Sequence, residues 1–271
     1  MEGKASRDCR PRLPGRAGQG RQCRRLSADH PELPVEVRSL YEEPAAHEEI
    51  AWGALEFHDV FKIFRSGPAE TVALRGLELK IEPRELVAVF GRSGSGKSTM
   101  LHLAGGLDEP SAGDVRVFGR SLVRLDEVEL AEYRAREVGI IFQNDNLWPA
   151  LSAHENVAVS LRLAGKPNVK RRTDGALEVF GLGKRGHQRA GSLSGGEQQR
   201  VAIAAAAARE APLVLADEPT GELDEANERI VLEALRRLRD DFGSTVVIVT
   251  HSPRVTEAVD RVVEVRDGRV L

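Results

Sequence analysis

Residues 91–98 carry the residue types and the spacing that a polyphosphate site needs. They read Gly-Arg-Ser-Gly-Ser-Gly-Lys-Ser and directly follow the apolar run of residues 86–90. The glycines let consecutive backbone N–H groups turn toward phosphate oxygens, Lys97 supplies a compact positive charge, and Ser98 offers a hydroxyl to Mg²⁺. A helix starting near Lys97 adds the positive end of its dipole. The pattern predicts a chain that binds ATP or GTP. The predicted nucleotide contacts in this segment are Gly91, Arg92, Ser93, Gly94, Ser95, Gly96, Lys97, Ser98 and Thr99.

Two adjacent carboxylates, Asp217 and Glu218, end a second apolar run, residues 213–216. A parallel strand delivers such residues at its carboxyl end, where ligands collect in α/β proteins. In this arrangement Asp217 would hold Mg²⁺ through water, and Glu218 would act as general base toward the attacking water. Taken alone, the pair would favour a simpler interpretation, two exposed acids that cap a strand.

A third segment distinguishes among the many proteins that share a phosphate loop. Residues 193–200 read Leu-Ser-Gly-Gly-Glu-Gln-Gln-Arg and precede an alanine-rich helical pattern. This segment resembles the signature sequence of the ATP-binding cassette (ABC) family. Physically, Ser194 and the two glycines open a helix whose first N–H groups can meet a phosphate.

The resemblance implies roles for residues at other strand ends. Gln143, after residues 138–142, matches the glutamine that contacts Mg²⁺ and the attacking water, so the implied metal ligands are Ser98, Gln143 and Asp217. His251, after the apolar run 245–250, matches the histidine that senses the γ-phosphate, although a lone histidine there is also compatible with a structural role. The implied catalytic residues are Glu218, His251 and Gln143.

The resemblance also implies a site shared between two copies of the chain. Two ATP molecules would bind head to tail between the subunits of a homodimer, and residues 221–224 would cross the interface. The residues implied to reach the partner's nucleotide are Ser194, Gly195, Gly196, Glu197 and Asp224. Phe64 stands where the family carries an adenine-stacking ring, with Phe61 as an alternative, and both rings are also compatible with core positions. Ala205 stands where the family usually has arginine.

Residues 72–79, 142–157 and 216–224 resemble a subgroup of lipoprotein-releasing, macrolide-exporting and cell-division ATPases, and the likeness covers residues 54–271. It implies a separate integral membrane permease with a large extracytoplasmic domain. The permease would bind the small-molecule or lipid-linked substrate, and the work would be export, lipoprotein release or force transmission. The competing classes are a soluble cassette ATPase acting on nucleic acid or ribosomes, and a nutrient-importer ATPase.

The strands and helices needed to position these residues alternate along the sequence, which predicts an α/β fold over residues 52–271. We expect a P-loop core with a parallel sheet, an antiparallel β subdomain from residues 55–64, 71–81 and 114–118, and a helical subdomain at about 145–190. Residues 226–239 predict a helix whose Ile230, Leu232, Leu235 and Leu238 enter the core.

Residues 1–51 differ in composition and are expected to form a disordered, charged extension. Residues 1–25 hold seven arginines, one lysine and both cysteines, while residues 26–50 hold seven acids. Cys9 and Cys23 make a poor zinc site and are expected to be free thiols. The basic arm could bind nucleic acid or an anionic membrane, but a nucleic-acid partner is not favoured because the arm has no interleaved aromatic residues. The alternatives are an upstream start codon and a tail without a specific role.

The longest apolar stretches are far shorter than the ~20 residues of a membrane-spanning helix. No secretory apolar segment is found near residue 1. We therefore expect a cytoplasmic ATPase, peripheral on the inner face of the cell membrane.

Overall fold

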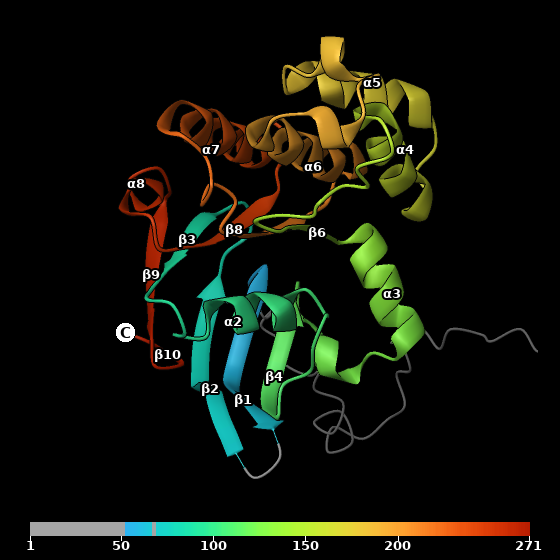
Figure 1. Ribbon diagram of the computed structural model, residues 1–271. Helices are drawn as coiled ribbons and strands as arrows, with labels where there is room; N and C mark the ends of the chain where they lie inside the picture. Colours follow the sequence, from blue (N-terminus) through green and yellow to red (C-terminus); the bar gives the residue numbers. More distant parts are fainter. Residues whose placement is uncertain (1–51, 67–68) are drawn as a thin grey trace, which may run out of the picture. The chain divides into compact units, whose positions relative to one another are not determined.

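The computed structural model describes residues 52–66 and 69–271, which lie within one compact unit (Figure 1). The extension predicted for residues 1–51 lies outside the described residues. The described part contains two sheets and a set of helices, and the α/β fold class predicted from the sequence is confirmed. None of the helices between residues 52 and 271, within the described ranges, has the length and apolarity needed to cross a bilayer.

The larger sheet runs in the order β10-β9-β3-β8-β7-β6. Its strands β9, β3, β8, β7 and β6 are parallel, and β10 adds an antiparallel edge that the sequence analysis did not predict. Both faces of the central strands are buried, as their unbroken Val, Leu, Ile and Ala runs require. The strands are β3 (Leu86–Phe90), β6 (Val138–Ile141), β7 (Leu213–Asp217), β8 (Thr245–Thr250), β9 (Arg261–Arg266) and β10 (Arg269–Val270).

The smaller sheet is antiparallel and runs in the order β2-β1-β4-β5. Its strands are β1 (Leu55–Ser66), β2 (Ala69–Ile81), β4 (Ala112–Val117) and β5 (Arg120–Ser121). Strand β1 has a bulge between His58 and Phe61 where it pairs with β4, and Asp59 in this bulge takes a φ of 48°. The bulge bends the long strand locally and increases its twist.

Helices cover the two faces of the parallel sheet. On one face, α2 contacts β2 and β4 of the antiparallel sheet as well as β7 and β8, so its apolar residues join the two sheets (Figure 1). On the other face, α4, α5, α6 and α7 share a second core with β7 and β8. The α-helices are α2 (Lys97–Ala104), α3 (Glu127–Arg136), α4 (Ala153–Leu163), α5 (Val169–Val179), α6 (Gly195–Arg209), α7 (Glu225–Asp240) and α8 (Pro253–Thr256), and the 3₁₀ helices are η2 (Leu122–Arg124), η3 (Gly183–Arg185) and η4 (Ala190–Ser192). The segment predicted as helical, residues 145–190, contains α4, α5 and η3.

Helix α7 corrects one prediction about the core. Leu232, Leu235 and Leu238 are buried, but Ile230 is 45% exposed. Ile230 lies one residue out of phase with Val231, which is buried and continues the stripe with Leu235 and Leu238. The mixed spacing of apolar residues in the sequence did not show which of the two neighbours faces the core.

Gly113, opposite the bulge of β1, generates a stability prediction. Its φ is +89°, and an added Cβ would lie 2.3 Å from the backbone oxygen of Asp59. Gly165 has a similar φ of +67° with open space around it, so it is a matched control. We expect Gly165→Ala to lower the free energy of unfolding by about 1 kcal/mol and Gly113→Ala by about 2 kcal/mol more, measured by urea denaturation. Equal losses would show that the clash with Asp59 relaxes without cost.

Candidate active site

The glycine-rich segment forms a loop between β3 and α2. Gly94 and Gly96 have φ values of +78° and +102°, in the region that side chains disfavour. A Cβ at Gly96 would lie 2.5 Å from the backbone oxygen of Ala73 in β2, so this position also requires glycine for close packing. The loop is therefore fixed by backbone conformation and by contact with the antiparallel sheet.

The polar groups inside this loop fit a polyphosphate. Lys97 is 7% exposed, and its Nζ donates to the backbone oxygens of Gly91 (2.8 Å) and Arg92 (3.0 Å). The ammonium thus lies across the loop, where phosphate oxygens can replace the carbonyl partners. The hydroxyl of Ser95 is buried without a hydrogen-bond partner, which is costly unless a ligand or water supplies one. The loop offers a buried cation, an unsatisfied hydroxyl and the N-terminus of α2 to an anion.

The β9–β10 turn braces the loop from outside, which the sequence analysis missed. The backbone N–H of Gly268 donates to the oxygen of Ser95 (3.0 Å), and a Cβ at Gly91 would lie 2.3 Å from the oxygen of Val265. Only the Asp-Gly turn signal was visible in the sequence, and it did not reveal what the turn contacts.

Asp217 and Ser98 come together from β7 and α2. The Ser98 hydroxyl donates to Oδ1 of Asp217 over 3.3 Å. Burial raises the pKa of Asp217, and the hydrogen bond from Ser98 opposes the rise. Within the described ranges, no three His, Cys, Asp or Glu residues form a metal cluster. One carboxylate and one hydroxyl nevertheless suit Mg²⁺, which is commonly bound by one or two carboxylates, water and phosphate oxygens.

Glu218 and His251 form a second polar pair at adjacent strand ends. Oε1 of Glu218 lies 2.7 Å from Nδ1 of His251, and Thr250 Oγ1 donates to Oε2 over 3.4 Å. Glu218 has a φ of 46°, a conformation costing of order 1 kcal/mol that tertiary contacts must hold. Its backbone N–H donates to the oxygen of Val249 (2.9 Å). The carboxylate is therefore oriented by β8, and the imidazole is 68% exposed beyond it.

Gln143 bonds a side chain of the loop that follows β7. Its Nε2 donates to Oε1 of Glu222 over 3.3 Å, and Asn144 Nδ2 donates to the same oxygen over 2.9 Å. The structure thus brings together Ser98 with Asp217 and Glu218 with His251, while Gln143 points to the loop after β7.

A side chain that the sequence analysis missed holds the backbone beside Gln143. Gln199 of α6 is 5% exposed, and its Nε2 donates to the oxygens of Phe142 (3.0 Å) and Gln143 (2.6 Å). Asn146 Nδ2 donates to Gln199 Oε1 over 3.1 Å, and Asn146 also bonds the backbone of Phe142. The only sequence signal was the glutamine pair beside the signature glycines, which gave no partner.

Two of the residues assigned to the partner's nucleotide, Ser194 and Asp224, cap helices within the chain. Ser194 begins α6 and forms a capping box with Glu197, whose Oε1 also pairs with Arg185 Nε at 3.1 Å. Asp224 caps α7 through the N–H of Asn227 (2.8 Å). A Cβ at Gly196 would lie 2.8 Å from Oδ1 of Asn227, so the starts of α6 and α7 pack closely.

Phe64 is 45% exposed on β1, and Lys62 Nζ lies 5.1 Å from its ring centre. It pairs with Thr71, two residues before Ala73, the residue whose oxygen contacts Gly96. Phe61 is half-buried against Gly76. Of the two rings, Phe64 is therefore the more exposed.

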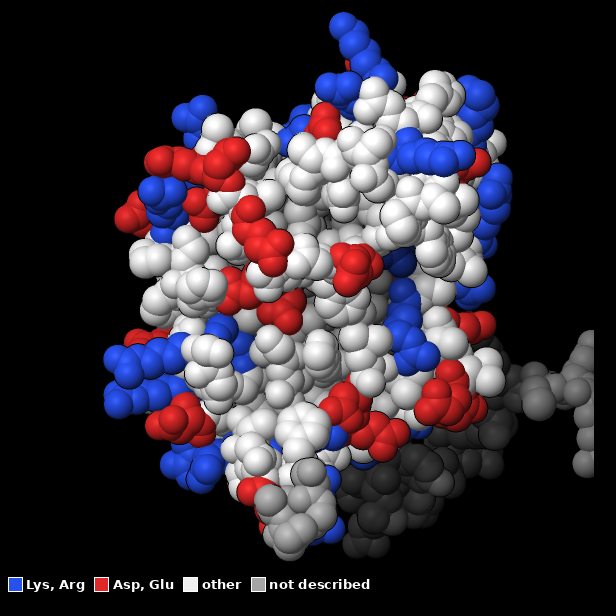
Figure 2. Space-filling view, viewed as in Figure 1, with Lys and Arg blue, Asp and Glu red and all other residues white. Residues whose placement is uncertain are grey.

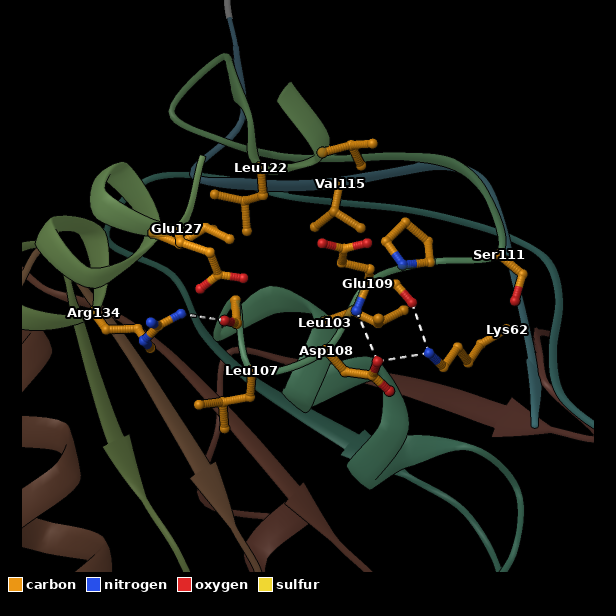
Figure 3. A pocket seen from close by; sticks show the side chains of 14 residues that line it. Lys62, Leu103, Leu107, Asp108, Glu109, Ser111, Val115, Leu122, Glu127 and Arg134 are labelled. Carbon is orange, nitrogen blue, oxygen red and sulfur yellow. Dashed lines mark hydrogen bonds and ion pairs between the residues drawn. The ribbon is translucent and has the colours of Figure 1, made fainter. Parts of the chain in front are cut away.

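A separate cavity of about 750 Å³ lies near the opposite end of α2 (Figure 3). Its lining includes Leu103, Leu122 and Glu127, and Lys62 Nζ there donates to Asp108 Oδ1 (2.6 Å) and the Glu109 oxygen (2.7 Å). Arg134 donates to the oxygen of Gly106 over 2.6 Å. The phosphate-loop residues do not line this cavity, so its size does not identify the nucleotide site.

Figure 2 shows both signs of charge on the face that it views, with acidic side chains from the region of α7 toward the middle and basic ones mainly along the margins. This face carries no continuous basic stripe of the kind that nucleic acid binding uses.

The phosphate loop, the acidic strand end and the signature-type helix start together define a P-loop ATPase of the ATP-binding cassette class. Residues 74–221 match the family model described as ABC transporter, and the chain belongs to this family. It is an ATP-binding cassette ATPase.

Relatives and solved structures agree with the assignment. The chain is 44% identical over 218 residues to an uncharacterized ABC transporter ATP-binding protein of Thermotoga maritima, covering 80% of this chain and 93% of the relative. It is 43% identical to the lipoprotein-releasing system ATP-binding protein LolD of Anaeromyxobacter dehalogenans, covering 83% and 95%. It is 42% identical to the macrolide export ATP-binding/permease protein MacB of Azoarcus sp., covering 80% of this chain but only 33% of that longer protein. The dimeric structure of MJ0796, a bacterial ABC transporter cassette, superposes with a TM-score of 0.74 at 36% identity, covering 80% and 96%, and the same values hold for its post-hydrolysis state bound to ADP and Pi.

The role of Gln199 in holding the backbone near Gln143 can be measured directly. Gln199→Ala removes donors to two carbonyl groups, so we expect faster amide hydrogen exchange over residues 142–146 and a loss of about 1–3 kcal/mol in the free energy of unfolding. Gln198→Ala is the control, because Gln198 also donates to a backbone oxygen, that of Leu193. Unchanged exchange over 142–146 in Gln199→Ala would contradict this role.

Proposed function

We propose that this chain is the ATP-hydrolysing subunit of a transporter in which two copies drive a separate membrane permease. The observation that supports this proposal is that the predicted site residues fall into two separate groups within one chain. The phosphate loop, Asp217, Glu218 and His251 converge at one sheet edge, while Ser194 and Asp224 are occupied as caps of other helices. A second copy completes such a site by bringing its α6 start to the phosphate loop. The dimeric cassette structures described above support this arrangement.

The residues on the phosphate side have distinct tasks in the proposal. Lys97, the N–H groups of residues 91–96 and the Ser95 hydroxyl bind the β- and γ-phosphates of ATP, and Phe64 stacks on adenine. Ser98, Asp217 and Gln143 would hold Mg²⁺, which neutralises phosphate charge and aligns the reacting oxygens. Gln143 must leave Glu222 to reach this position, so we expect the segment after β6 to move when nucleotide binds.

Hydrolysis in the proposal depends on the Glu218–His251 pair. Glu218 accepts a proton from the attacking water, and His251 holds the carboxylate and faces the γ-phosphate. Ser194, Gly195, Gly196 and Glu197 of the second copy close over the same phosphate with the N-terminus of α6, and Asp224 lies at the interface. Cleavage removes the phosphate that both copies share and releases the dimer.

The permease partner is supported by the exposed surface beside Gln143. Trp148 is 54% exposed between Gln143 and α4, and Leu163 at the end of α4 is 67% exposed. Large exposed apolar side chains of this kind suit a protein partner. Since two relatives are named for lipoprotein release and macrolide export, we propose a permease that binds a small-molecule or lipid-linked substrate, with this chain on the inner face of the membrane.

The role of Glu218 predicts a trapped dimer. Glu218→Gln keeps the shape of the side chain but removes the base, so we expect ATP turnover to fall by about 10²–10⁴-fold while ATP binding persists and dimers accumulate. Dimers are measured by light scattering with size-exclusion chromatography. Lys97→Ala is the contrasting variant, since it should lose tight ATP binding and remain monomeric. Ordinary turnover by Glu218→Gln would refute the assigned role.

The permease is tested by purifying the tagged full-length chain from gently solubilised native membranes and identifying stoichiometric partners by mass spectrometry. We expect an integral membrane protein with a large extracytoplasmic domain, retained by the wild type and reduced by Trp148→Ala. A solute-binding protein in the complex would indicate an importer, and ribosomal components or nucleic acid without a permease would overturn the transport assignment.

A further inference from the structure

Glu228, a buried carboxylate on α7, connects two loops. One loop carries His251, and the other leads to Asp224. Glu228 is only 8% exposed, and it lies between the loop that follows β7 and the loop that follows β8. Oε1 of Glu228 accepts hydrogen bonds from the Thr220 hydroxyl (3.4 Å) and the Ser252 hydroxyl (3.2 Å). One carboxylate oxygen is thus shared by both loops.

The other carboxylate oxygen faces a cation. Arg254 NH1 lies 3.4 Å from Oε2 of Glu228, and its NH2 lies 3.6 Å from Glu225 Oε1. Burying a carboxylate is costly unless it is hydrogen-bonded and paired, so the position of Glu228 is maintained only while these donors remain in place. The individual contacts are at the long end of the hydrogen-bond range, and their combined geometry fixes the loops more than any single bond.

The same network continues to the carboxylate beside His251. The Ser252 backbone N–H donates to Thr250 Oγ1 over 3.0 Å, and Thr250 Oγ1 donates to Glu218 Oε2 over 3.4 Å. Glu228 is therefore linked to Glu218 through Ser252 and Thr250, because the Ser252 hydroxyl bonds Glu228 and the Ser252 backbone N–H bonds Thr250. On the opposite side, Thr220 is 5% exposed and lies four residues before Asp224.

We propose that Glu228 is a positioning residue that couples the loop of Ser252 and His251 to the loop of Thr220 and Asp224, so that the two loops are set together for hydrolysis. The inference rests on the proposed roles of Glu218, His251 and Asp224. Glu228 contacts none of the reacting groups itself. Its removal should leave nucleotide binding by the phosphate loop in place while the loops lose their fixed relation.

The chain offers a matched control on the same helix. Glu225 also faces Arg254, but its side chain is 79% exposed, compared with 10% for Glu228. Both changes to alanine remove one carboxylate near Arg254, whereas only Glu228→Ala deprives Thr220 and Ser252 of their common acceptor. We expect Glu228→Ala to lower kcat about tenfold with the KM for ATP changed less than about twofold, a split that marks loss of transition-state geometry. Glu225→Ala should keep kcat within about twofold of the wild type, as expected for an exposed pair.

A conservative variant separates positioning from charge. Glu228→Gln retains an oxygen acceptor for Thr220 and Ser252 but loses the charge facing Arg254. We expect it to recover most of the kcat lost in Glu228→Ala. If Glu228→Gln and Glu228→Ala lose the same activity, positioning through the shared acceptor is refuted.

Coupling between the loops is measured by a double-mutant cycle in kcat. Thr220→Val and Ser252→Ala should be non-additive in the wild-type chain and additive when position 228 is alanine. The wild-type cycle leaves Glu228 in place, so it tests the proposal even if Glu228→Ala fails to fold. Additivity in the wild-type cycle would overturn the coupling.

Thermal unfolding of each variant distinguishes the positioning role from a purely structural role. In a purely structural role, the melting temperature falls but kcat at a permissive temperature does not. That result would also overturn the inference. The proposed function is refuted if Glu218→Gln turns over ATP normally. If Glu218→Gln loses turnover but Glu228→Ala keeps the wild-type kcat, only the inference about Glu228 is refuted.

Discussion

The register of three neighbouring parallel strands is the constraint on which the site depends. Phe90 of β3 pairs with Thr250 of β8, and Val249 of β8 pairs with Asp217 of β7. Since all three strands run in the same direction, the phosphate loop, the Asp217–Glu218 pair and His251 emerge at one edge. The strands are held on both faces, because alternate residues belong to the two cores. Ala88 and Ile248 belong to the core shared with α4–α7, and Val89 and Val249 belong to the core shared with α2 and the antiparallel sheet. Neither face is free to shift without exposing apolar side chains to water.

Around this rigid edge, the polar contacts are local and replaceable. Lys97 bonds the carbonyl groups of its own loop, and Gln143 bonds Glu222. These partners satisfy the same charged or polar groups that engage ATP and Mg²⁺ in the proposed function, where binding would exchange one set of hydrogen bonds for another at modest net cost. The exchange is coupled to movement only where the replaced partner lies on another loop. That condition holds for Gln143 but not for Lys97.

The helix starts assigned to the second copy are already organised within one chain. The capping box of Ser194 and Glu197 satisfies N–H groups at the start of α6, and Asp224 does the same for α7. The contact of Gly196 with Asn227 fixes the two starts against each other. In the proposed dimer, an interface assembled from such preformed caps would lose little conformational entropy on association.

The sequence by itself determined the parts of this protein that are encoded within a few consecutive residues. The phosphate loop, the start of α6 at Ser194, the buried strands and the strand-end acids each follow from spacing and residue type, and the structure has them at the expected positions. Tertiary structure alone decided the rest. The burial of Val231 rather than Ile230, the contact of Gln199 with the Gln143 oxygen across 56 positions, and the brace from Gly268 to Ser95 all join distant segments. Their partners are chosen by the packing of helices and turns on the sheets, which no local pattern specifies.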